Sequence, residues 1–155
     1  MNKTSIDRIE KRVELSVPPA RVWRALTDAG EFGQWFRVNL DGPFVPGKPT
    51  RGKLTYPGCE DWDIEVVVAK MEPERLFSYQ WHPYAFEANV DYSKERPTLV
   101  EFKLTKTTGG TLLTVTETGF DAIPEARREE AFRMHVDGWA EQLTNIQTYL
   151  ARSPG

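Results

Sequence analysis

The chain has 155 residues, of which 39% are hydrophobic and 28% are charged, so it is long enough to bury one sizeable core and too short for two domains. Its 20 Lys and Arg residues against 23 Asp and Glu residues give a net charge of -3, and no segment holds a run of basic residues. This composition excludes the basic surface of a nucleic-acid-binding protein and predicts a single domain over residues 1–155.

The N-terminal segment and the cysteine content indicate where the protein works. Residues 1–16 hold no apolar stretch that could act as a signal peptide or a membrane span. Cys59 is the only cysteine, so the chain forms no internal disulfide, and in its predicted turn this thiol has no evident role. We expect a cytoplasmic protein that does not bind membranes.

The start of the chain predicts a strand followed by a helix. Residues 9–17 alternate apolar and polar side chains, which is typical of a half-buried strand. Pro18 and Pro19 end this strand and fit the first turn of a helix, where the missing N–H group of proline would have had no partner. The apolar face of that helix consists of Val22, Trp23 and Leu26. The residues predicted to point away from it are Arg21, Arg24 and Asp28.

A second, very short helix and an irregular segment follow. Phe32, Trp35 and Phe36 recur at helical spacing shortly after Gly30. Residues 39–52 contain three Pro and three Gly, and this composition predicts a connection without regular structure.

Antiparallel strands are predicted for the middle of the chain. The segments that alternate apolar and polar residues are 52–57, 62–69, 76–82, 100–105 and 113–117. One face of the third segment carries the aromatic residues Phe77, Tyr79 and Trp81. Residues 83–97 show no clean period and predict a long loop, whereas Gly109 and Gly110 predict a tight hairpin turn.

The C-terminal segment predicts one long helix. Its apolar residues recur at gaps of 4, 3, 4, 3 and 4, which places them on one stripe of a helix of about 25 residues, roughly 38 Å long. The members of the stripe are Phe132, Val136, Trp139, Leu143, Ile146 and Leu150. Strands followed by this helix indicate an α+β fold in which the sheet bends around the helix and leaves a space wherever side chains fail to meet.

Five motifs of the sequence are similar to those of a known family. They are, in order, PPARVWRALTD, FGQWF, MEPERLFSYQW, GGTLLTVTETGF and GWAEQLTNIQTYL. This series resembles the AHSA-type branch of the START-like (SRPBCC) superfamily, which is named for the activator of the heat-shock-protein-90 ATPase. The resemblance implies the helix-grip (START-like) fold, a curved antiparallel sheet of six or seven strands around the C-terminal helix with two short helices after the first strand and an apolar cavity inside.

The resemblance leaves several functions open. Relatives with this fold include lipid carriers, hormone receptors, aromatase/cyclase-like enzymes and a chaperone activator, so the fold alone does not choose among them. The chaperone activator also has a separate N-terminal domain that these 155 residues do not contain, and this favours other functions over a chaperone partner.

The motifs of several enzyme classes are missing from the sequence. There is no G-x-S-x-G elbow, no H-x-x-x-H or C-x-x-C spacing, and no glycine-rich loop between a strand and a helix. We therefore expect no metal, no cofactor and no catalytic triad. The acidic residues Glu60, Asp61 and Asp63 are typical of a solvated turn.

Glu117 interrupts an apolar face, and it has two interpretations. It follows Leu113 and Val115 at period two, so its carboxyl group points inward, where burial raises its pKa unless a cation or hydrogen-bond donors meet it. Alternatively, it lies near the strand end and reaches water. His135 flanks the buried face of the long helix and could meet Glu117 or a ligand, or be a partly exposed histidine bonded to its neighbours. Glu117 and His135 are the weak catalytic candidates.

Aromatic side chains supply most of the predicted ligand-binding residues. An aromatic stripe is usually plain core, as we expect for Trp23 and Trp139, but Tyr79 and Trp81 carry polar atoms that suit a cavity wall. Gly138, in mid-helix, is expected to permit the close approach of another backbone. The candidate ligand-binding residues are Trp35, Phe36, Trp62, Tyr79, Trp81, Phe102, Glu117, Phe132, His135, Val136 and Trp139.

Three functions follow, in order of preference. The first is a protein that binds a small hydrophobic or aromatic molecule between sheet and helix. The second is an enzyme of the cyclase or dehydratase kind, in which Glu117 or His135 moves a proton. The third is a protein-interaction module like the chaperone activator's C-terminal domain, which requires an exposed apolar surface.

Overall fold

The computed structural model describes residues 8–60, 62–82 and 95–155. Most of the predicted loop over residues 83–97 lies outside the described residues, as does Asp61. The elements in chain order are β1 (Arg8–Leu15), α1 (Pro19–Thr27), α2 (Ala29–Phe36), β2 (Val38–Leu40), β3 (Pro49–Leu54), β4 (Asp63–Glu72), β5 (Leu76–Trp81), β6 (Thr98–Thr107), β7 (Gly110–Thr118), the short 3₁₀ helix η1 (Phe120–Ala122) and α3 (Glu125–Arg152).

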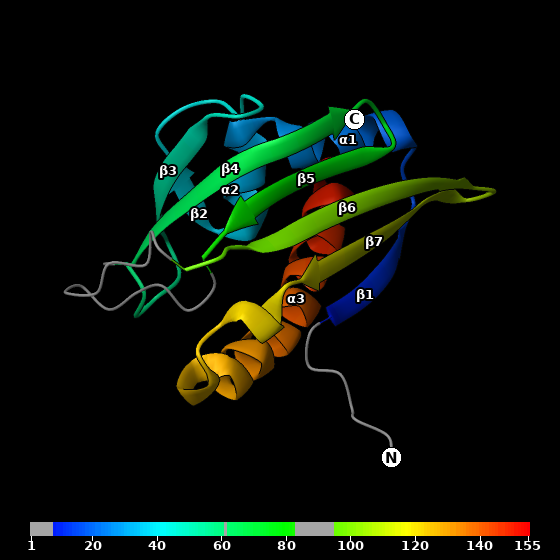
Figure 1. Ribbon diagram of the computed structural model, residues 1–155. Helices are drawn as coiled ribbons and strands as arrows, with labels where there is room; N and C mark the ends of the chain where they lie inside the picture. Colours follow the sequence, from blue (N-terminus) through cyan, green and yellow to red (C-terminus); the bar gives the residue numbers. More distant parts are fainter. Residues whose placement is uncertain (1–7, 61, 83–94) are drawn as a thin grey trace, which may run out of the picture.

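Seven strands form one antiparallel sheet in the order β1-β7-β6-β5-β4-β3-β2. Figure 1 shows this sheet curved, with the three α-helices on the same side of it. The hairpin between β6 and β7 turns between Thr107 and Gly110, as the two glycines predicted. The architecture is the α+β helix-grip fold, and it confirms the predicted fold class.

The two short helices connect opposite edges of the sheet. β1 and β2 are consecutive strands, but one lies at each edge, so the chain has to cross the sheet between them. Asp28 caps the start of α2, because its side chain accepts a hydrogen bond from the backbone N–H of Glu31 at 3.0 Å. Arg37 ends α2 in the left-handed region, with φ of 68°, and the chain turns directly into β2.

Aromatic rings fill the core between the sheet and the helices. Phe77 and Tyr79 of β5 are completely buried, as the alternation predicted, and Phe102 of β6 packs against both at centroid distances of 6.1 Å. Trp35 reaches the same cluster from α2, and its indole N–H donates to the carbonyl oxygen of Ala25 at 2.8 Å. Rings at these separations are in contact, so this part of the core has no room for a ligand.

The long helix covers the sheet with only part of its apolar stripe. Its 28 residues begin beyond the strands, as Figure 1 shows, and only the later part lies across the sheet. The buried members of the stripe are Trp139, Leu143, Ile146 and Leu150. Phe132 and Val136, nearer the start of α3, are half-buried. Phe132 packs on Phe120 of η1, with ring centroids 5.3 Å apart.

Two predictions about local structure are wrong. Residues 39–52 are not irregular throughout, because Val38–Leu40 forms the edge strand β2 and pairs with β3. The local composition did not predict β2, because this strand is stabilised by its pairing with β3. Arg21 does not point to solvent, although it lies off the apolar face of α1. Only 6% of it is exposed, because the end of α3 covers it.

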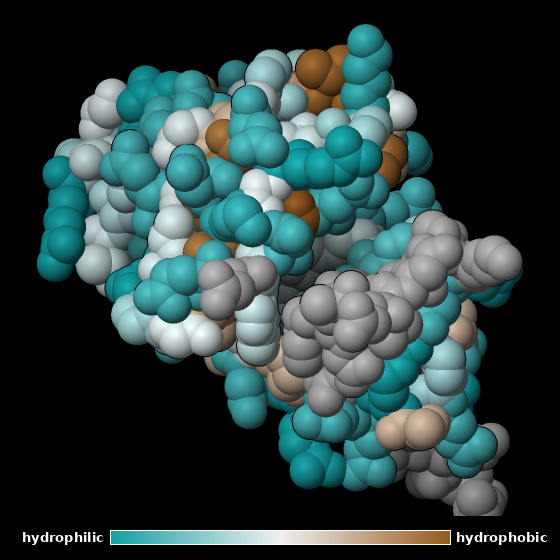
Figure 2. Space-filling model, turned by 90° about the vertical axis from the view of Figure 1, so that its left-hand side faces the viewer, coloured by the Kyte–Doolittle hydropathy of each residue, from teal (hydrophilic) through white to brown (hydrophobic). Residues whose placement is uncertain are grey.

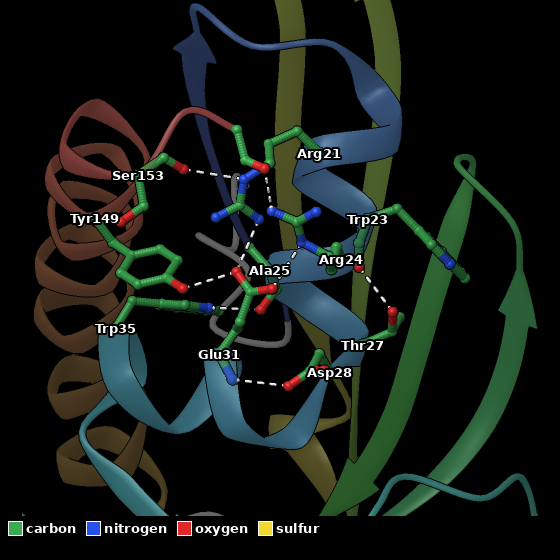
Figure 3. A network of polar contacts seen from close by, with 11 residues as sticks. Arg21, Trp23, Arg24, Ala25, Thr27, Asp28, Glu31, Trp35, Tyr149 and Ser153 are labelled. Carbon is green, nitrogen blue, oxygen red and sulfur yellow. Dashed lines mark hydrogen bonds and ion pairs between the residues drawn. The ribbon is translucent and has the colours of Figure 1, made fainter.

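Glu31 joins the short helices to the end of the long helix (Figure 3). Its carboxylate forms ion pairs with Arg21 and Arg24, each at 2.8 Å, and accepts a hydrogen bond from the Tyr149 hydroxyl at 2.7 Å. The guanidinium group of Arg21 also donates to the carbonyl oxygen of Ser153 at 3.0 Å. These contacts fix the C-terminal end of α3 against α1 and α2.

Replacing Glu31 with Gln is expected to destabilise the fold. The amide keeps the shape of the side chain but removes the charge, and it leaves the buried guanidinium of Arg21 without its counter-ion. We expect the free energy of unfolding to fall by about 1 to 3 kcal/mol, measured by denaturant titration. Glu10→Gln is the control, because Glu10 pairs with Arg8 and Arg12 on an exposed face of β1 and its replacement is expected to have a much smaller effect. Equal losses for both variants would contradict the role given to Glu31.

Candidate functional site

A cavity of about 910 Å³ lies between the strands β2, β3 and β4 and the middle of α3. Its aromatic wall consists of Phe36, Tyr56, Trp62, Trp81 and Trp139. Figure 2 views the molecule from the side on which β2 and β3 lie, and hydrophobic residues form only small, separate areas on this face.

Charged side chains from neighbouring strands border the cavity. Arg51 of β3 pairs with Glu65 of β4 at 2.5 Å, and Lys53 pairs with Asp63 at 2.7 Å. Each pair stands directly across the two strands, where the register places opposite charges side by side. The cavity thus combines an aromatic wall with a charged border.

Gly138 opens the cavity on the side of α3. A Cβ atom built on this glycine would have no heavy atom within 4 Å, and Gly138 lines the cavity. Among the described residues no other backbone approaches it closely, so the predicted close approach is not found there. Its missing side chain instead leaves room between Trp139 and the strands.

The carboxylate of Glu117 lies buried beside the aromatic wall and accepts four hydrogen bonds. One oxygen, Oε1, accepts from Nδ1 of His135 at 2.6 Å and from the indole N–H of Trp139 at 2.8 Å. The other, Oε2, accepts from the indole N–H of Trp81 at 2.8 Å and from the hydroxyl of Thr98 at 2.5 Å. Glu117 is 0% exposed, so the inward orientation is correct and the alternative of a water-exposed strand end is wrong.

These donors reverse the pKa shift expected from burial. Burial alone raises the pKa of the Glu117 carboxyl group, but the charge of His135 and hydrogen bonds from His135, Thr98 and Trp81 hold that pKa below its ordinary value. The ionised carboxylate is therefore the stable form in the folded protein. An ionised carboxylate has no proton to donate, so Glu117 in this form is not a general acid.

His135 connects the buried carboxylate to the cavity. Its ring packs between Trp81 and Phe120, with centroid distances of 5.6 Å to each. Nδ1 bonds to Glu117, and Nε2 has no hydrogen-bond partner among the described residues and is not buried. The side chain is 14% exposed and lines the cavity. The sequence left three roles open for His135, namely contact with Glu117, contact with a ligand, or a bond to its chain neighbours. The structure shows the contact with Glu117.

The pKa of Tyr56, which lines the cavity, is also shifted from its ordinary value. Burial raises the pKa of the Tyr56 hydroxyl, and the charge of Glu141 adds to the increase, although a hydrogen bond from Asn145 lowers it. The Asn145 amide donates to this hydroxyl at 2.8 Å. Tyr56 therefore stays neutral, and its hydroxyl lies at the cavity border between Asn145, which donates to it, and Glu141, which accepts from it.

The structure separates the predicted ligand-binding residues into two groups. Those that line the cavity are Phe36, Trp62, Trp81, His135 and Trp139. Those that do not line it are Trp35, Tyr79, Phe102, Glu117, Phe132 and Val136. Tyr79 belongs to the packed core, where its hydroxyl has no partner among the described residues, and burial together with the Glu117 charge raises its pKa.

Sequence reasoning missed the residues on the strand side of the cavity. These include Tyr56, Arg51, Lys53 and Glu65. Lys53 and Asp63, on two consecutive predicted strands, were a usable signal for one cross-strand ion pair, whereas Arg51 fell in the segment predicted to be irregular. No local signal pointed to Thr98, because it lies 19 residues from Glu117 in the chain.

Within residues 8–60, 62–82 and 95–155, no three His, Cys, Asp or Glu side chains are grouped closely enough to hold a metal ion. Cys59 lies on the cavity wall with a free thiol. In the same part of the chain, no helix has both the length and the apolar composition needed to cross a bilayer.

Residues 16–151 match the family described as activator of Hsp90 ATPase homolog 1-like protein. The chain belongs to this family. The match covers nearly all of the sequence and confirms the resemblance found in its motifs. A comparison with curated proteins found none that matches this chain.

Solved structures share the fold of this family member. Protein MLL2253 from Mesorhizobium loti is 23% identical, with a TM-score of 0.74 over 94% of this chain and 97% of that one. Protein NE0264 from Nitrosomonas europaea is 18% identical, with a TM-score of 0.73 over 98% and 99%. DynU16, a putative protein in the dynemicin biosynthetic locus, is 22% identical, with a TM-score of 0.72 over 94% of this chain and 47% of that one. At these identities the likeness shows the fold alone.

Replacing Glu117 with Gln is expected to lower the free energy of unfolding by about 3 to 5 kcal/mol at neutral pH, because His135 loses its counter-ion and the new amide group faces donors. Since the folded-state pKa is lowered, the ionised carboxylate stabilises the fold above the ordinary value of 4.5. This stabilisation disappears as the pH falls through the folded value. The difference between wild type and variant therefore shrinks below pH 4.5, as measured by denaturant titrations across pH.

The control for this series is Glu129→Gln. Glu129 lies on an exposed face of α3 and pairs with Arg133 one turn away, so its loss should cost less than about 0.5 kcal/mol. A Glu117→Gln variant as stable as wild type at neutral pH would contradict the lowered pKa.

Proposed function

We propose that this protein binds a small hydrophobic or aromatic molecule in the cavity between β2, β3, β4 and α3. The observation that carries the proposal is the aromatic wall, where Phe36, Trp62, Trp81 and Trp139 face an open volume of about 910 Å³ beside a core that is otherwise packed. Cavities of a few hundred to about 1,000 Å³ with mostly apolar walls are the usual size and character of small-molecule sites.

The border of the cavity supports a ligand with one polar end. Aromatic rings bury the apolar part of such a molecule, while the ion pairs Arg51–Glu65 and Lys53–Asp63 and the Tyr56 hydroxyl meet its polar atoms near water. Asp41 and Glu141 line the cavity as well, so its charged residues carry a net negative charge and disfavour an anionic ligand. The ligand class we propose is therefore largely planar and not anionic.

An enzymatic function in the same cavity is the second candidate. The observation that favours it is the bond between His135 and the buried carboxylate of Glu117, since a carboxylate orients a histidine and stabilises its protonated form in many proton-transfer sites. In such a reaction His135 would move the proton, and Glu117 would only position it. We propose no substrate for this reaction.

The protein-interaction function finds less support. It requires an exposed apolar surface, but among the described residues the exposed large hydrophobic side chains are only Val45 and Met134, at 39% and 37%. A small-molecule partner is therefore preferred over a protein partner. We also propose a cytoplasmic location, which the single cysteine of the sequence supports.

Titration with N-phenyl-1-naphthylamine, a neutral hydrophobic fluorescent probe, tests the binding function. We expect one probe to bind per chain and to quench tryptophan emission, because Trp62, Trp81 and Trp139 line the cavity. The variant Gly138→Phe places a ring in the open space beside Trp139 and should weaken probe binding by about tenfold or more.

Ala140→Phe is the matched control, because it adds the same ring to an exposed position of the same helix. It should leave probe affinity within about twofold of wild type. A folded wild-type protein that shows no saturable binding would count against the proposal, as would equal binding by the two phenylalanine variants.

A further inference from the structure

We infer that the cavity binds aromatic molecules that carry a positive charge, for example on a quaternary ring nitrogen. This inference rests on the proposed binding function and assigns the ligand its charge. Two features of the lining support it, namely a surplus of carboxylates and the ring faces of the aromatic wall.

Carboxylates outnumber Lys and Arg side chains in the lining of the cavity. The carboxylates are Asp41, Asp63, Glu65 and Glu141, and the basic residues are Arg51 and Lys53. Each basic residue already pairs with a carboxylate across the strands, Arg51 with Glu65 at 2.5 Å and Lys53 with Asp63 at 2.7 Å. No ion pair between described residues involves Asp41 or Glu141. The charge that remains for a ligand is therefore negative.

This negative surplus does not depend on the protonation state of His135, which also lines the cavity. When the histidine ring is a cation, the buried carboxylate of Glu117 balances it across their 2.6 Å contact. When the ring is neutral, Glu117 adds a further negative charge behind the wall. Arg37 does not line the cavity, and its single positive charge near Tyr56 is smaller than the surplus of two carboxylates.

The two carboxylates without an ion pair come from different elements. Asp41 directly follows β2, where its backbone N–H donates to the carbonyl oxygen of Arg51 at 2.8 Å. Glu141 lies three residues after Gly138 on α3, so the two positions share a face of the helix, and it accepts a hydrogen bond from the Tyr56 hydroxyl. A cation beside Gly138 is therefore attracted both from the helix and from the strands.

The aromatic wall also attracts a cation. The indole N–H groups of Trp81 and Trp139 donate to Glu117, so these residues present ring surface to the cavity. The face of an aromatic ring is electrostatically negative, and Trp attracts a cation most strongly within about 6 Å of the ring centroid. Arg37 makes this kind of contact with the ring of Tyr56, at 5.2 Å from its centroid. A flat aromatic cation combines this attraction with ring packing.

The test compares three compounds of similar shape and different charge. N-methylquinolinium is a cation, 1-methylnaphthalene is neutral and 1-naphthoate is an anion. Each displaces the bound probe N-phenyl-1-naphthylamine at about pH 8, above the ordinary histidine pKa of about 6.5. We expect quinolinium to bind at least as tightly as methylnaphthalene and about tenfold or more tightly than naphthoate. A cavity indifferent to charge would favour methylnaphthalene, because a cation loses more hydration on entry.

The double variant Asp41→Asn/Glu141→Gln removes the two unpaired charges and keeps the shape of both side chains. Its affinity for quinolinium should fall by about three- to tenfold, while its affinity for methylnaphthalene stays within about twofold of wild type. Glu14→Gln/Glu130→Gln is the matched control, because it removes the same net charge from exposed positions outside the cavity. It should leave all three affinities within about twofold.

Wild type alone gives a second measurement. Raising sodium chloride from about 20 mM to about 500 mM screens exposed carboxylates, so the affinity ratio of quinolinium to methylnaphthalene should fall by about threefold or more.

Three results would overturn the inference and leave cavity binding intact. They are quinolinium that binds more weakly than methylnaphthalene or no better than naphthoate, an affinity ratio that salt does not change, and equal quinolinium affinities of the two double variants. Failure of the neutral probe to bind wild type would instead overturn the proposed function.

Discussion

The buried carboxylate of Glu117 is the constraint on which the site depends. An unpaired charge with no exposure to water is too costly to keep, so the fold has to bring donors to both oxygens. Those donors come from the end of β5, the start of β6 and two successive turns of α3. Polar contacts as well as apolar packing therefore specify the position of α3 along the sheet. Apolar packing tolerates a small displacement of the helix far better than four hydrogen bonds do.

The same contacts explain why there is a cavity beside such a dense core. Trp81 and Trp139 turn their N–H groups toward Glu117, and this orientation leaves their rings at the boundary between core and open space. Beyond them, Gly138 contributes no side chain and β3 and β4 carry charged residues that pair with each other. Trp62 lines this side as part of the wall, and the cavity stays open among the described residues.

The sequence predicted the fold well and the site partly. Periodicity placed Phe77, Tyr79 and Glu117 on inward faces because one side of the sheet is covered, and five motifs identified the family. Periodicity cannot say what an inward side chain meets. The donors to Glu117 lie 18 to 36 residues away along the chain, so the sequence left open whether burial raises its pKa or a cation and donors lower it, and the tertiary structure decides for the lowered pKa. Arg21 was misplaced for the same reason, since its cover comes from residues 132 positions later.

The pairing of β1 with β7 also governs how the chain can acquire its fold. Arg8 lies opposite Thr118 and Leu15 opposite Thr111, so the first strand pairs with a segment made about 100 residues later. Contacts at this separation are slow to form, because a long loop must close before any of them is made. During synthesis, the apolar side chains of Ile9 and Leu15 stay without their final cover until β7 has left the ribosome. The nascent protein therefore exposes a hydrophobic strand for most of its translation, and this is the stage at which it most needs protection from aggregation.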